Sequence, residues 1–172
     1  MRLFVAVELP QDMREALAET SAALRDAVHG RYVAPDSFHL TLAFLGEVPG
    51  SRVPELAEVI EEACKVHAPL DASLAELGSF GRPRSATLWQ SIRADGLTQL
   101  ADDVRAGLRE AGFSLDEKSF LAHVTLMRAA DLKHGELPMP SIASGTLDTV
   151  TLFRSDLSGP RPVYEPLVRI VL

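Results

Sequence analysis

A short motif, histidine-x-threonine-leucine, occurs once in each half of the chain on a strand-like segment. The first copy lies in residues 37–48 (SFHLTLAFLGEV) and the second in residues 120–127 (FLAHVTLM). In a β-strand, residues i and i+2 point to the same face. Each segment should therefore present an imidazole and a hydroxyl together and bury aliphatic residues opposite. The pattern predicts two related halves whose strands meet at one site.

Strand-like and helical periodicities alternate along the rest of the chain. Residues 3–9 are apolar on both faces, which predicts a central strand. We expect an α+β fold with two lobes, each built from an antiparallel sheet and helices, around an active-site cleft. One domain over residues 1–172 is expected, because each half alone has too little core. The expected strands are residues 3–9, 37–48, 73–80, 86–92, 120–127, 146–153 and 167–172, and the expected helices are residues 11–28, 54–67 and 95–112.

Charge and composition exclude several classes of protein. The net charge of −7 argues against a broad electrostatic grip on duplex DNA, although it leaves room for a pocket that holds one phosphate. Cys64 is the single cysteine, so neither a disulfide framework nor a cysteine metal cluster is expected. The apolar run at residues 3–7 is too short for a secretory signal or a membrane span, so we expect neither there. We expect a cytoplasmic monomer without membrane partners.

The two histidines and their threonine neighbours match what phosphodiester displacement requires. One base must deprotonate the attacking group, and one acid must protonate the departing oxygen on the opposite side. His39 and His123 can fill these roles, because imidazole has a pKa of ~6.5. Thr41 and Thr125 can donate hydrogen bonds to the non-bridging oxygens. The chain lacks H-x-H and H-E-x-x-H motifs, so a site without metal or cofactor is expected.

A single H-x-T motif is a weak signal, because buried histidines on strands are common. Two copies in matching contexts favour a shared site over two structural histidines. The other histidines have no such match. We expect His29, His67 and His134 at helix ends or in loops, exposed to solvent and without partners.

Most of the chain resembles the 2H phosphoesterase superfamily. Within it, the chain is most similar to the bacterial and archaeal RNA 2′,3′-cyclic phosphodiesterases, first described as 2′-5′ RNA ligases. One departure is Ala122, where family members usually have proline. That position carries no proton, so the chemistry should be unaffected. The matching segments are RLFVAVELP, FHLTLAFLGEV, GSFGRPRSATLW, AHVTLMR and LFRSDLSGPRPVYEPL.

The resemblance implies hydrolysis of RNA 2′,3′-cyclic phosphate ends to 2′-phosphomonoesters without a cofactor, and possible 2′-5′ ligation in reverse. It implies that His39 is the proton donor to the leaving O3′ and that His123 is the proton acceptor for water. Thr41 and Thr125 would then bind the phosphate oxygens.

Further site candidates follow from position. Phe44 and Arg128 each lie five residues after a motif histidine, where Phe44 could stack on the terminal base and Arg128 could clamp the phosphate. Arg82 and Arg84 could line the RNA path, and Tyr164 is a candidate for the cleft rim. The alternatives are core packing for Phe44 and ordinary surface charges for the arginines.

Three functions remain open at this point. The first is hydrolysis of cyclic phosphate ends, with RNA ends or nucleotides as partners. The second keeps the chemistry but acts on a small cyclic phosphate, such as a nucleotide or an ADP-ribose derivative. The third is an RNA-end binding module without turnover.

Overall fold

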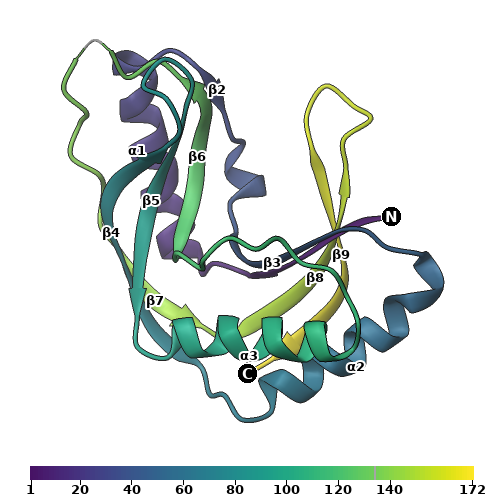
Figure 1. Ribbon diagram of the computed structural model, residues 1–172. Coiled ribbons are helices and arrows are strands. Elements are labelled where there is room, and N and C mark those ends of the chain that lie inside the picture. The colour runs from purple at the N-terminus through teal and green to yellow at the C-terminus, as the bar shows by residue number, and fades with distance from the viewer. Residues whose placement is uncertain (134) are drawn as a thin grey trace.

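The computed structural model describes residues 1–133 and 135–172, and it contains two antiparallel sheets flanked by helices (Figure 1). The expected α+β class is confirmed. In chain order the elements are β1 (Arg2–Val7), α1 (Gln11–Ala27), β2 (Arg31–Tyr32), the 3₁₀ turn Pro35–Ser37, β3 (Leu40–Glu47), the 3₁₀ turn Gly50–Arg52, α2 (Val53–Cys64), β4 (Leu70–Phe80), β5 (Ala86–Ala94), α3 (Leu97–Glu110), β6 (His123–Ala130), β7 (Ser144–Leu147), β8 (Thr149–Asp156) and β9 (Val163–Val171).

Each sheet carries its own helices and forms one lobe. In the first lobe the strand order is β3-β1-β8-β9, and α2 and α3 pack against this sheet. In the second lobe the order is β2-β6-β5-β4-β7, and α1 packs against β6 and β7 (Figure 1). One H-x-T motif belongs to β3 and the other to β6, and these two strands contact each other where the lobes meet.

The two lobes do not correspond to the two halves of the chain. β1 lies in the first lobe, whereas α1, the next element, packs on the second. The chain returns to the first lobe for β3 and α2, crosses to the second for β4 and β5, and returns for α3. After β6 and β7 in the second lobe, it comes back to the first for β8 and β9. This arrangement differs from the one suggested by the repeated motif, in which each half supplies its own helices and sheet.

β1 is the central strand that its apolar faces predict. It pairs with β3 on one side and with β8 on the other. Leu3, Val5 and Val7 are fully buried on one face, and Phe4 and Ala6 are buried on the other. Burial of both faces explains why the strand reads as a continuous apolar run.

Several boundaries differ from those expected. Residues 35–37 form a 3₁₀ turn, and β3 begins only at Leu40, so His39 lies immediately before the strand. The single strand expected at residues 146–153 is wrong: β7 ends at Leu147 in the second lobe, and β8 begins at Thr149 in the first. β2 has only two residues and β7 only four, too short to give an alternating pattern in the sequence. β9 begins at Val163, four residues earlier than expected. Within the described residues, no helix is long and apolar enough to cross a membrane.

Candidate active site

His39 and His123 hold equivalent positions and make equivalent hydrogen bonds. His39 directly precedes β3, and His123 is the first residue of β6. Nδ1 of His39 donates to the carbonyl oxygen of Ser37 (2.7 Å), and Nδ1 of His123 donates to that of Leu121 (2.6 Å). Because a carbonyl oxygen only accepts, both rings carry a proton on Nδ1 in the neutral form. Nε2 of each ring therefore remains available to a ligand.

Aromatic rings surround His39 in the first lobe. Its ring centroid lies 4.8 Å from that of Phe4 and 5.1 Å from that of Tyr164, whose ring stands at 83° to the imidazole. Phe153 stacks on Phe4 at 5.2 Å. Tyr164, a candidate for the cleft rim from the sequence, therefore packs directly against a motif histidine. The sequence gives no signal for Phe4 beyond an apolar strand residue.

Two aromatic rings of the second lobe pack against His123, as Phe4 and Tyr164 pack against His39. The Phe80 ring is edge-on to the imidazole at 5.2 Å and 90°, and the Trp89 ring lies 5.7 Å away. Nε1 of Trp89 is buried without a hydrogen-bond partner among the described residues. Packing therefore holds the indole in place. Phe80 and Trp89 were not among the residues singled out from the sequence, because single aromatic residues on strands are usually core.

The threonines face the same way as their histidines. Thr41 is opposite Ala6 in the β1–β3 ladder, and Thr125 is opposite Trp89 in the β5–β6 ladder. Both threonines are half-buried. Since Trp89 also packs beside His123, the imidazole and the hydroxyl of the second motif share one face of the sheet.

A β-bulge follows each threonine. In β3, Thr41 pairs with Ala6 and Ala43 with Val5, so Leu42 is the extra residue. In β6, Thr125 pairs with Trp89 and Met127 with Leu88, so Leu126 is the extra residue. A bulge shifts the side-chain alternation by one position. The leucine that ends each H-x-T-L motif is thus the bulged residue.

These bulges decide where Phe44 and Arg128 lie. In a regular strand, a residue five positions after a histidine would point to the opposite face. With the bulge, Phe44 pairs with Phe4 and shares the face of Thr41, and its side chain is 41% exposed. Arg128, also exposed, follows Met127 and shares the face of Thr125. Both side chains therefore lie on the faces that carry the motifs.

The electrostatics link the two motifs. The pKa of His39 is lowered to about 4, mainly by burial and in addition by the positive charges of Arg128 and His123, against the raising effect of its bond to Ser37. The pKa of His123 is also lowered, first by burial and then by Arg128. Arg128 thus acts on both imidazoles, and His123 acts on His39. The three groups lie within electrostatic range of one another.

Arg105 joins the two motif regions from α3. It is 7% exposed, and its Nη2 donates to the carbonyl oxygens of Asp116 (2.8 Å) and Lys118 (2.9 Å) in the segment before β6. Its Nη1 lies 3.4 Å from the carbonyl oxygen of Leu42, the bulged residue of β3. A buried arginine on an amphipathic helix has no distinctive sequence signal, so this link could not be foreseen.

The remaining candidates lie outside this cluster. Arg82 and Arg84 are exposed in the turn between β4 and β5, which follows Phe80. His29 is exposed as expected. The expectation for His67 is wrong, because its Nε2 lies 2.9 Å from Oδ2 of Asp103 and its side chain is 9% exposed. It joins the end of α2 to α3. His134 falls outside the described residues.

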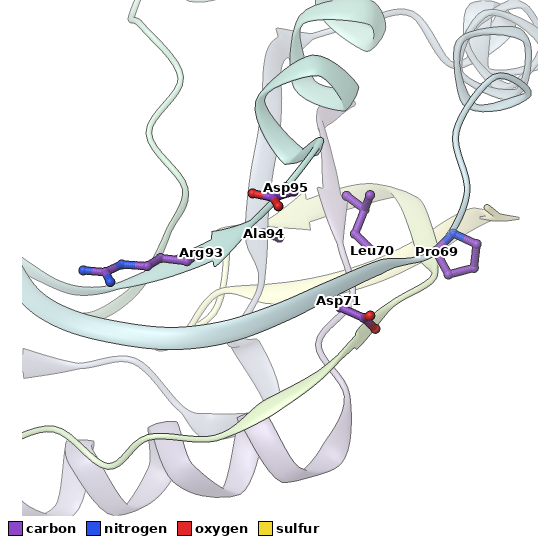
Figure 2. A pocket seen from close by; sticks show the side chains of 6 residues that line it. All are labelled: Pro69, Leu70, Asp71, Arg93, Ala94 and Asp95. Carbon is purple, nitrogen blue, oxygen red and sulfur yellow. The ribbon is translucent and has the colours of Figure 1, made fainter.

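Two cavities differ in their relation to the histidines. The larger, about 430 Å³, lies at the ends of β4 and β5, and its lining includes Asp71, Arg93 and Asp95 (Figure 2). No histidine lines it. The smaller, about 160 Å³, is lined by His39 and Tyr164 and adjoins the motif face of the first lobe. Among residues 1–133 and 135–172, no three His, Cys, Asp or Glu side chains are placed to hold a metal ion.

Comparisons with known proteins place the chain in a family. The family model "LigT like Phosphoesterase" matches residues 7–89 and again 90–164, with one H-x-T motif in each match. The chain is 33% identical to an RNA 2′,3′-cyclic phosphodiesterase of Escherichia coli, over 99% of this chain and 96% of that protein. It is 32% identical to one of Thermus thermophilus, over 100% and 90%. A Geobacillus stearothermophilus relative is 30% identical over 98% of this chain, which spans 56% of the relative's length.

Solved structures show the same architecture. A Thermus thermophilus protein superimposes with a TM-score of 0.88 at 32% identity, covering 100% of this chain and 98% of that one. Escherichia coli LigT complexed with 3′-AMP gives a TM-score of 0.83 at 32% identity, over 99% and 97% of the two chains. With both sequence and structure matched over essentially its whole length, the chain belongs to the LigT-like phosphoesterase family of 2H phosphoesterases.

Proposed function

We propose that this protein is an RNA 2′,3′-cyclic phosphodiesterase in which His39 and His123 act as general acid and general base. The observation that carries the proposal is the shared geometry of the two imidazoles. Each has Nδ1 fixed by a backbone carbonyl, and each stands beside a threonine at the contact between the lobes. Two such groups on opposite sides of one phosphate suit an in-line displacement.

In the proposed mechanism, Nε2 of His123 takes a proton from a water molecule, whose oxygen attacks the phosphorus. The P–O3′ bond breaks, and Nε2 of protonated His39 gives its proton to the departing O3′. The product is a 2′-phosphomonoester, and the proton held by His123 returns to solvent. Thr41, Thr125 and Arg128 bind the non-bridging oxygens, where negative charge builds in the transition state.

The low pKa of His39 bears on its role as the acid. In the free protein burial keeps this imidazole mostly neutral at pH 7, since its pKa is about 4. A phosphodiester carries a negative charge, and placing it between the rings favours their protonated forms. Substrate binding therefore promotes the uptake of the proton that His39 delivers to O3′.

Two further features concern the substrate. Phe44 offers an exposed ring to a base of the RNA, a contact that suits any sequence. The same acid and base could also cleave a 2′-5′ linkage, whose reverse is ligation. In ligation a 5′-hydroxyl gives its proton to His123 and attacks the cyclic phosphate, the P–O3′ bond breaks, and His39 protonates O3′ as the 2′-5′ linkage forms. Water at ~55 M favours hydrolysis in an open site.

The test is turnover and product identity on an RNA ending in a 2′,3′-cyclic phosphate, with excess chelator present. We expect turnover to persist and phosphorus NMR to show the phosphate on O2′. His39→Ala and His123→Ala should each lower kcat by about 10²–10⁴-fold. A loss under about tenfold would remove that residue from its role. Activity that vanishes with chelator and returns with added metal would contradict the mechanism.

A further inference from the structure

The 160 Å³ pocket beside His39 contains a fixed hydrogen-bond acceptor that the phosphate chemistry does not use. Glu8, at the end of β1, lines this pocket together with residues of β8 and β9. Its Oε1 accepts hydrogen bonds from Oγ1 of Thr151 (2.6 Å) and from Nε of Arg169 (2.7 Å). Thr151 is fully buried, which fixes its hydroxyl. Among the described residues, Oε2 of Glu8 makes no hydrogen bond, so it is open to a ligand donor.

The size and walls of this pocket suit one flat ring system. Drug-sized ligands occupy pockets of ~300–1,000 Å³, so 160 Å³ fits a single heteroaromatic group and not a whole nucleotide. Phe153 and Tyr164 form part of its lining and supply aromatic surface. Tyr164 also stands edge-on to His39, so a ring held here adjoins the proposed acid.

The charges of the pocket disfavour a second phosphate. Its lining contains the carboxylates of Glu8 and Asp36 and the guanidinium groups of Arg14 and Arg169. Each guanidinium is paired with one of these carboxylates, at 2.7 Å for Arg169–Glu8 and 3.7 Å for Arg14–Asp36. A balanced set of this kind attracts no net anion, but it offers donors and acceptors to a neutral polar ring.

The proposed mechanism indicates which part of the substrate reaches this pocket. If His39 protonates O3′, the ribose that bears O3′ lies on the side of the first lobe. The base of that ribose is then the ring system nearest the pocket. Placing the terminal base here leaves Phe44, at the other side of Phe4, to a base further along the RNA.

We propose that this pocket binds the terminal nucleobase and that Oε2 of Glu8 accepts a hydrogen bond from an exocyclic amino group. The inference rests on the proposed function for its assignment to the terminal nucleotide. Cytosine and adenine offer an amino group, whereas uracil offers a carbonyl oxygen at the same edge, which repels a carboxylate. The pocket should therefore discriminate between otherwise similar pyrimidine ends.

The experiment compares cytidine and uridine compounds in binding and in turnover. Calorimetry with cytidine 2′-monophosphate, uridine 2′-monophosphate and inorganic phosphate measures binding without any reaction. Rates with the two nucleoside 2′,3′-cyclic phosphates give kcat and KM. We expect about a tenfold preference for cytidine, expressed in Kd and KM and not in kcat. Glu8→Gln should reduce this preference to less than about threefold, because an amide serves as donor or acceptor.

The chain supplies a matched control. Glu76 on β4 also pairs with an arginine, Arg93, at 2.9 Å on the surface of the second lobe. Glu76→Gln should leave the cytidine preference unchanged. Thr151→Val, which removes the donor to Oε1 while the carboxylate remains, should weaken the preference less than Glu8→Gln does. This variant also tests the pocket if Glu8→Gln proves unstable.

The outcomes separate the pocket from the reaction. Equal binding of both nucleotides and of phosphate by the unaltered protein would overturn the base pocket while leaving hydrolysis intact. The base pocket would also be overturned if Glu8→Gln and Glu76→Gln changed the cytidine preference equally. Base-selective binding without turnover on any cyclic phosphate would support the pocket and overturn the proposed function.

Discussion

Gly78 lies directly under the indole of Trp89, so closely that a Cβ at Gly78 would be 2.1 Å from the ring carbon Cη2. Trp89 in turn supports His123, with ring centroids 5.7 Å apart. Because Gly78 has no side chain, the Trp89 indole can pack against the backbone of β4. The indole in turn restricts the position of the His123 imidazole, the proposed base. The Trp89 ring thus connects the backbone at Gly78 to the His123 imidazole.

Replacing that glycine tests the link. Gly78→Ala should displace the indole, because its methyl group cannot share the space of the ring, and overpacking of this kind costs about 1–3 kcal/mol. We expect kcat to fall more than KM rises, since the displaced group is the proposed base. Gly107→Ala is the control, because a Cβ there would meet Val59 at an ordinary 3.4 Å. A Gly78→Ala protein with unchanged kcat would show that His123 does not depend on the indole.

Trp89 is the single tryptophan of the chain, so its fluorescence should report the protonation of His123. A protonated imidazole quenches an adjacent excited indole by accepting an electron. As the pH falls, emission should drop with a midpoint below 6.5, because burial and Arg128 lower the pKa of His123. Inorganic phosphate should move the midpoint upward, since its negative charge favours the protonated ring. His123→Gln should abolish the transition, and its persistence would assign the quenching to another group.

Arg128 should influence both the affinity for phosphate and the pH dependence. Its positive charge lowers the pKa of His39 and of His123, so Arg128→Gln should raise both. The pH profile of kcat/KM reports the pKa values of the imidazoles in the free protein, so its limbs should move to higher pH. The maximum of kcat/KM should fall by about tenfold or more, because a donor to the phosphate is lost. Arg128→Lys keeps the charge and should keep the position of the limbs. Equal shifts in both variants would contradict an electrostatic cause.

Arg105 should matter for stability and for the alignment of the two motifs. Arg105→Met removes the donor to the partly buried carbonyl oxygens of Asp116 and Lys118. The loss of these hydrogen bonds from a charged donor should cost about 1.5–3 kcal/mol in the free energy of unfolding, measured with urea. Arg109→Met, on the same helix but exposed, provides a control with the same chemical change. Similar losses in both proteins would show that the buried contacts add little.

Local periodicity predicted the helices and the longer strands because it records burial, and β1 shows this most clearly. Its alternating apolar faces predicted a central strand, and it lies between β3 and β8. The helices α1, α2 and α3 were expected from their apolar spacing. The interleaving of the two lobes was not foreseen, because the pairing of β1 with β8 depends on contacts between distant segments. Local patterns carry little information about such contacts.

In the proposed site, too, local spacing predicted some features, and others depend on contacts between distant segments. The motifs predicted that His39 and Thr41 share a face, as do His123 and Thr125, because their spacing is two residues. Strict alternation would have turned Phe44 away, and the bulge at Leu42 reverses that result. A bulge is set by the register between two strands, so the sequence of one strand does not reveal it. The partner of His67 lies on another helix and was missed for the same reason.

The crossing of the chain between the lobes has a consequence for its synthesis. β1 emerges from the ribosome first, but its second neighbour, β8, is made only after residue 148. Until β8 is made, one edge of β1 therefore stays unpaired, with apolar side chains that aggregate readily. Stalling translation before β8 should leave a product that is sensitive to protease, even though both histidines are already present.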